Sequence, residues 1–188
     1  IEGADAVFLQ GYTLLERQLP AMVDAAVALA RQQGKPLYFD IGPPSLAVPK
    51  ARLRAALAQM DVVMMTSDEI DIVAPGTSEA DACASLFALG VSLVVVKRGG
   101  HGCTVFAPGE RIDAPGLPVQ VIDTVGAGDC FDAAFIYGRC VGMGIAQAAA
   151  LANGMGAACV QKVAAGRNAP TRDEVAAVLR AHGYLWSF

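Results

Sequence analysis

The chain has 188 residues, of which 54% are hydrophobic and 17% charged, and this composition predicts a folded domain with a sizeable core and argues against a disordered protein. The formal net charge of −4 provides no basic surface, so we expect neither nucleic acid nor a membrane as a partner. Five cysteines are scattered without a Cys-x-x-Cys pair or a nearby histidine, which argues against a zinc site and favours reduced thiols. With no signal peptide and no membrane-length apolar run, we expect a cytoplasmic protein.

Short apolar runs alternate with helical segments along the first part of the chain. The runs that we predict to be strands are residues 6–9, 36–40, 61–65, 91–96 and 103–107. The segments with helical periodicity are residues 17–33, 50–59 and 78–89. Strands that alternate with helices pair in parallel through right-handed crossovers, so this pattern predicts a parallel sheet covered by helices.

The rest of the chain adds one strand-like run and three helical segments. The run is residues 117–122, and the predicted helices are residues 130–141, 145–160 and 172–181. Gly138 keeps one face of the first of these helices small, which favours close packing against a neighbouring helix. We therefore predict an α/β fold in which residues 1–188 form one domain, a doubly wound, mainly parallel sheet with helices on both faces.

The stretch Asp123 to Asp129 lies between the last apolar run and the helical segment that follows it. The first N–H groups of a helix have no partner within the helix, and the helix dipole adds positive charge there, so the backbone of Gly126, Ala127 and Gly128 is a candidate anion hole. A carboxylate at Asp129 would repel a bound phosphate. It makes chemical sense where a hydroxyl lies between the two, because Asp129 can then take the proton of that hydroxyl as it attacks phosphorus.

The fourteen residues from Asp123 to Ile136 closely resemble the C-terminal signature of the ribokinase-like carbohydrate kinases, the PfkB family. The resemblance implies a ribokinase-like fold and an enzyme that moves the γ-phosphoryl group of ATP, with Mg²⁺, to a hydroxyl of a sugar or sugar-like acceptor. Asp129 would be the base and would also contact the acceptor. Two alternatives stay open, namely a nucleoside kinase of the same family and a catalytically silent sensor of nucleotide or sugar.

The resemblance assigns the nucleotide to two further places in the chain. Lys97, Gly99 and Gly102 match the loop on the nucleotide side, where a Gly-x-x-Gly turn follows a strand and basic residues lie near the triphosphate. The alternative is a plain hairpin turn with solvated cations. Asn153 matches a neighbour of the adenine base, and the alternative is a buried amide bound to a backbone carbonyl.

Three acidic residues are candidate ligands for the acceptor or for cations. Asp40, at the end of a predicted strand, would help to place the substrate or magnesium, or it caps a loop. Glu69 would act on Mg²⁺, although Ser67 stands where the family has Asn and the segment serves equally well as an acidic helix start. Asp123 would hold a monovalent cation, usually K⁺, together with the loop of residues 162–170.

The chain begins at Ile1, and proteins of this family are substantially longer. The resemblance covers the C-terminal portion of the family, so we expect a fragment that lacks the N-terminal lid region and most sugar-contacting residues. A homodimer formed through that lid is a further expectation from the family. The identity of the acceptor is left open, with some similarity to the kinases of keto-deoxy sugar acids around Val96 to Gly99.

Overall fold

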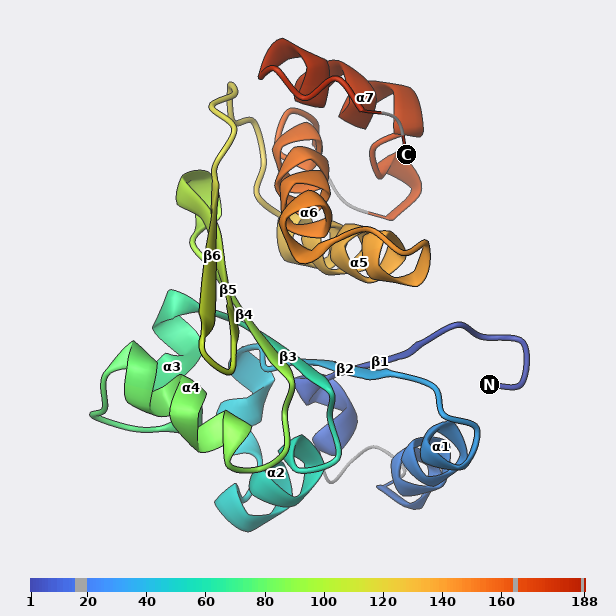
Figure 1. Cartoon of the computed structure of the whole chain (residues 1–188), viewed down its shortest axis with the longest axis vertical. Coiled ribbons are helices and arrows are strands. Elements are labelled where there is room, and N and C mark those ends of the chain that lie inside the picture. The colour runs from blue at the N-terminus through green and yellow to red at the C-terminus, as the bar shows by residue number, and fades with distance from the viewer. Residues whose placement is uncertain (16–19, 164–165, 187) are drawn as a thin grey trace. The chain divides into compact units, whose positions relative to one another are not determined.

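The computed structural model of the chain describes residues 1–15, 20–163, 166–186 and 188. Contacts divide these residues into two compact units, one of residues 1–97 and 106–111 and the other of residues 98–105 and 112–188. That residues 1–188 act as one kinase domain stays a prediction. Figure 1 labels the helices and strands along the chain.

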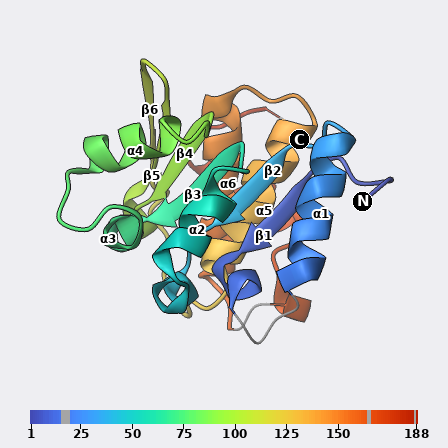
Figure 2. The ribbon, with the colours of Figure 1, turned by 90° about the horizontal axis from the view of Figure 1, so that it is seen from below.

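Six strands form one mostly parallel sheet in the order β1-β2-β3-β4-β5-β6 (Figure 1). The strands are β1 (Val7–Gln10), β2 (Leu37–Asp40), β3 (Val62–Thr66), β4 (Leu93–Lys97), β5 (Gly102–Ala107) and β6 (Glu110–Pro115). The first four lie side by side and run in the same direction (Figure 2). Their register pairs Gln10 with Asp40 and Thr66 with Lys97, so polar residues meet at the carboxyl edge, where ligands bind in such sheets.

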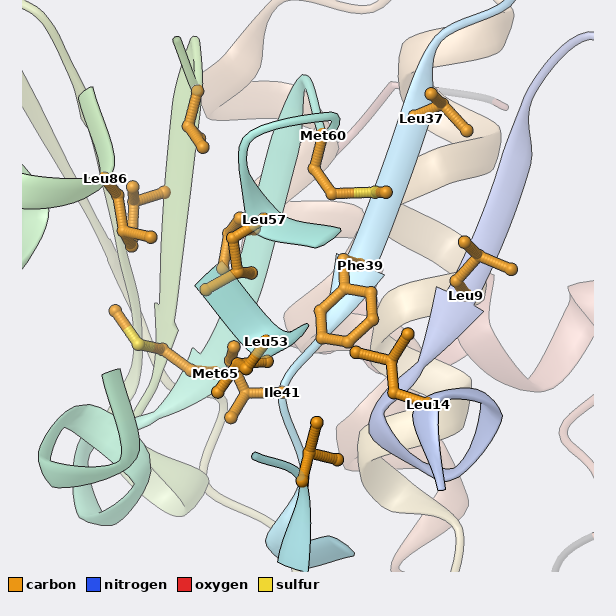
Figure 3. Close-up of a cluster of buried hydrophobic side chains, with 14 of the residues drawn as sticks. Leu9, Leu14, Leu37, Phe39, Ile41, Leu53, Leu57, Met60, Met65 and Leu86 are labelled. Atoms are coloured by element: carbon orange, nitrogen blue, oxygen red, sulfur yellow. The ribbon is translucent and has the colours of Figure 1, made fainter. Parts of the chain in front are cut away.

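The core of the first unit lies on one face of the sheet, against helices α1 (Pro20–Gln32), α2 (Lys50–Leu57) and α4 (Glu79–Phe87). Figure 3 shows Phe39 of β2 in the middle of this cluster, with Leu9 and Leu14 toward one side and Leu53 and Leu57 toward the other. Alternate strand residues such as Tyr38 point to the opposite face and are also buried. Burial on both faces is typical of a parallel sheet and confirms the predicted fold class.

Three helices dominate the second unit, α5 (Ala127–Cys140), α6 (Ile145–Cys159) and α7 (Arg172–Ala181). As predicted, Gly138 lets α5 and α6 approach closely, because a Cβ there would lie 3.1 Å from the Cβ of Ala148. Gly154 plays the same part between α6 and α7, where a Cβ would lie 2.7 Å from Leu179. Thr171 caps α7, since its hydroxyl accepts a hydrogen bond from the Glu174 N–H.

One predicted strand is absent, one strand was missed, and one helix begins earlier than predicted. Residues 117–122 form no strand, because Pro118 has no N–H to donate to a ladder and the Ile122 N–H donates instead to Val160 O. The missed strand is β6, a polar segment whose hairpin with β5 turns at Gly109, where φ is 81°. Helix α5 begins at Ala127 rather than at residue 130, and the predicted start of α1 at residues 17–19 lies outside the described residues.

Candidate active site

The turn before α5 has the geometry of an anion site. Gly126 caps the helix in the left-handed conformation, with φ 78° and ψ 2°, which a side chain disfavours. The first intrahelical bond runs from the Cys130 N–H to Gly126 O at 2.9 Å. Gly128 and Asp129 therefore lie in the first turn, where N–H groups point along the axis without a partner in the helix. Both residues are exposed, so a phosphate and a hydroxyl can reach them.

Hydrogen bonds from within the same unit hold this turn in place. The N–H groups of Ile122 and Asp123 both donate to Val160 O, at 2.7 and 3.2 Å, which ties the turn to the end of α6. The Val125 N–H donates to Asp123 Oδ1 at 3.0 Å, and the Ala127 N–H donates to Thr124 O at 3.2 Å. The turn is thus set before any ligand arrives, which favours binding to charge that develops during a reaction.

A second glycine turn, Gly99–His101, joins β4 to β5. Its ends are closed by the Arg98 N–H, which donates to Gly102 O at 2.8 Å, and by the His101 N–H, which donates to Arg98 O at 3.1 Å. Gly99 and Gly102 have φ values of 53° and 92°, so both positions favour glycine. These hydrogen bonds do not show whether the loop binds nucleotide, so its nucleotide contact stays a prediction.

Lys97 lies at the end of β4 and is only 8% exposed. Its Nζ donates to Asp40 Oδ1 at 2.7 Å, reaching across β3, and both side chains are largely buried. The alternative of a solvated cation is therefore wrong for Lys97. Instead, the structure brings together two residues that sequence patterns assigned separately, one to nucleotide and one to substrate.

Asn153 lies on α6 and is buried. Its Nδ2 donates to Ala114 O at 3.1 Å and to Pro115 O at 3.0 Å, so the alternative of a buried amide bound to backbone carbonyls is confirmed. Burial raises the pKa of the Cys103 thiol to about 12. Contact of Asn153 with adenine stays a prediction.

The candidate metal ligands Glu69 and Asp123 both serve local structure. Glu69 completes a capping box in which its Oε2 accepts the Thr66 N–H at 2.8 Å, so the acidic helix start is present with Thr66, rather than Ser67, as its cap. Within the described residues, no three His, Cys, Asp or Glu side chains are grouped to hold a metal ion. Magnesium in phosphotransferases needs only one or two carboxylates beside the phosphates, so a lone buried carboxylate such as Glu69 fits that chemistry.

Comparison with known proteins identifies the family. The model of the pfkB family carbohydrate kinases matches residues 1–172. The chain belongs to the pfkB family. The ribokinase of Arabidopsis thaliana is 30% identical to it over 188 aligned positions, which cover 90% of this chain and 46% of the relative. A 5-dehydro-2-deoxygluconokinase of Listeria monocytogenes is 28% identical, covering 95% of this chain and 58% of that relative.

A solved structure from E. coli, bound to ATP and Mg²⁺, has the same fold as this pfkB family chain. Its TM-score is 0.88 at 26% sequence identity, and the match covers 96% of this chain and 60% of the other. The chain therefore spans roughly half the length of the relatives that it matches. Among the described residues, no helix is long and apolar enough to cross a bilayer.

Sequence patterns missed several residues that shape the site of this pfkB family member. Thr104, on β5, accepts from Arg98 Nε at 3.1 Å and donates to Asp113 Oδ1 at 2.7 Å. Gly116 and Val160 act through their backbones, and no side-chain pattern marks such positions. The Pro115-Gly116 pair was the one available signal, because such a pair punctuates a chain at a turn.

Proposed function

We propose that this chain carries the ATP site and the catalytic base of a kinase that transfers the γ-phosphoryl group of ATP to a hydroxyl of a sugar or sugar-like acceptor. The observation that carries the proposal is the turn at Gly126 to Asp129, which places two exposed residues, Gly128 and the carboxylate Asp129, in the first turn of a helix. Membership of the pfkB family supports it.

In the proposed reaction, Asp129 accepts the proton of the acceptor hydroxyl as the oxygen attacks the γ-phosphorus. The bond to the β,γ-bridging oxygen breaks, and ADP leaves. Backbone N–H groups of the turn at Gly126, Ala127 and Gly128 would face the charge on the transferring group, although that of Ala127 already has an acceptor in Thr124 O. Phosphoryl transfer depends mainly on such positioning and charge stabilisation.

The nucleotide would bind at the loop of Gly99 to Gly102, in the same unit as the turn. Mg²⁺ bound to the phosphates would neutralise their charge, and Glu69 is the proposed carboxylate on its protein side. Asp123 would contribute to a monovalent cation site, for which K⁺ is the proposed ion. Its Oδ1 already fixes the turn through the Val125 N–H, so an ion there would stiffen the anion hole.

The relatives' names suggest the class of acceptor. One relative is named ribokinase and another 5-dehydro-2-deoxygluconokinase, so we propose a pentose, a hexose or a keto-deoxy sugar acid as the acceptor. Asp40 would help to place it. The ion pair with Lys97 holds that carboxylate at the end of β2.

The test is ADP production by the full-length protein with Mg²⁺, with and without K⁺, against sugars, keto-deoxy sugar acids and nucleosides. We expect one acceptor class to support turnover and K⁺ to raise the rate. Turnover with nucleosides alone would replace the proposed acceptor class. Binding of ATP without transfer to any acceptor would contradict the kinase and favour a silent sensor.

A further inference from the structure

Asn153 connects α6 to the end of β6. Its two amide hydrogens go to the carbonyl oxygens of consecutive residues, Ala114 and Pro115, at 3.1 and 3.0 Å. The side chain is only 8% exposed, so these bonds form away from water, where an unpaired carbonyl is costly. The amide therefore fixes the backbone at the point where β6 ends.

The backbone that Asn153 holds is in direct contact with the glycine loop. The Gly116 N–H donates to His101 O at 3.1 Å. A Cβ on Gly116 would lie 2.0 Å from Gly100 O, and one on Gly102 would lie 2.2 Å from Ala114 O. These approaches require glycine at positions 102 and 116, and they place the loop directly against the Ala114 to Gly116 segment.

Asp113, which precedes the Ala114 to Gly116 segment, is linked to the start of the loop at Arg98. Arg98, which opens the loop, donates through Nε to Thr104 Oγ1, and Thr104 donates to Asp113 Oδ1 at 2.7 Å. Residues 114–116 thus contact the loop directly, and Asp113 is linked through Thr104 to Arg98, which precedes it. All of these groups belong to the second unit.

We propose that Asn153 is a positioning residue that sets the loop of Gly99 to Gly102 for nucleotide binding, through the carbonyls of Ala114 and Pro115 and without donating to the nucleotide. The proposal rests on the proposed function, because the nucleotide role of the loop is assigned there. Since both amide hydrogens are used, loss of Asn153 affects all nucleotides alike and leaves the preference for a base unchanged.

The test compares Asn153→Leu, which keeps the size of the side chain and removes its hydrogen bonds, with wild type. Gln161→Leu is the matched control, because Gln161 Nε2 also donates to a backbone carbonyl, Ala157 O at 3.1 Å, away from the loop. Amide hydrogen exchange is followed at Arg98, whose N–H closes the loop by donating to Gly102 O, and at Gly116, whose N–H donates to His101 O of the loop. We expect exchange at both amides to rise at least tenfold in Asn153→Leu only.

Nucleotide affinity supplies the second readout. The dissociation constants of MgATP and MgGTP should rise by the same factor, about tenfold, in Asn153→Leu and stay unchanged in Gln161→Leu. If the Leu variant does not fold, Asn153→Ser, which keeps one donor and leaves room for water, takes its place with a smaller effect in the same direction.

Two outcomes would overturn the positioning role. Unchanged exchange at Arg98 and Gly116 would show that Asn153 does not hold the loop, and a loss of affinity for ATP alone would show direct contact with the base. A wild-type protein that binds no nucleotide would overturn the proposed function instead. The exchange measurement needs no nucleotide, so it distinguishes the two failures.

Discussion

At the scale of single residues, the ion pair of Lys97 and Asp40 changes what each side chain can do. The two residues belong to β4 and β2, which are separated by β3, and their atoms meet at 2.7 Å. An amino group that is paired and buried is less available to a triphosphate than a solvated one. The pair instead fixes a carboxylate at the carboxyl edge of the sheet, where ligands bind in folds of this kind.

We expect each single substitution of this pair to be strongly destabilising. Asp40→Asn or Lys97→Met breaks the buried ion pair by removing one of its two charges, which costs about 3 to 5 kcal/mol of the free energy of unfolding. The double variant should recover most of that loss, because it leaves no buried charge. Urea denaturation of wild type, the two single variants and the double variant measures the free energy of unfolding. If the loss in the double variant equals the sum of the two single losses, the two charges are not coupled and the prediction is refuted.

At the scale of elements, the helix ends were more predictable than the irregular segments. The cap of α7 depends on local chemistry within four residues, because Thr171 and Glu174 form a capping box. The start of α5 moved to Ala127, because the left-handed Gly126 lets the helix begin directly after the turn. The strand predicted at 117–122 failed because apolar composition alone does not show where the backbone hydrogen bonds go, and here they go to Val160 O.

The first turn of α7 carries a pH-dependent contribution to stability. Hydrogen bonds from Lys162 Nζ and from the backbone and hydroxyl of Thr171 lower the pKa of Glu174 from 4.5 to about 2. Because the folded-state pKa is lowered, the contribution is present above pH 4.5 and is lost as the pH falls toward 2. The Glu174 side chain is exposed, so added salt should weaken this contribution to stability.

We therefore expect Glu174→Gln to be less stable than wild type near neutral pH and equal to it near pH 2. The measurement is the free energy of unfolding of both proteins across this pH range. Asp173→Asn, in the same helical turn, removes the same charge and serves as the control. A difference between wild type and Glu174→Gln that stays constant with pH would contradict the assignment.

At the scale of the whole molecule, alternation of apolar runs and helices was enough to predict the fold class, and comparison with solved structures confirms it. The turn at Asp123 to Asp129 could be predicted because its residues are contiguous. The pairing of Lys97 with Asp40 and the junction of Asn153 with residues 114 and 115 could not, since they depend on which strands and helices become neighbours. Sequence patterns thus predicted contiguous features, and packing decided which distant residues become neighbours.

The central claim is that Asp129 is the base of a phosphotransferase, and Asp129→Asn in the full-length protein tests it most directly. With the acceptor found by the ADP assay, we expect kcat to fall roughly 10²- to 10⁴-fold, because Asn cannot take the proton. The dissociation constant of MgATP should stay within about threefold of wild type, since the carboxylate acts mainly in the transition state. Asp173→Asn, which also removes a carboxylate from a first helical turn, should leave both values unchanged. Retention of most of the turnover in Asp129→Asn would contradict the account.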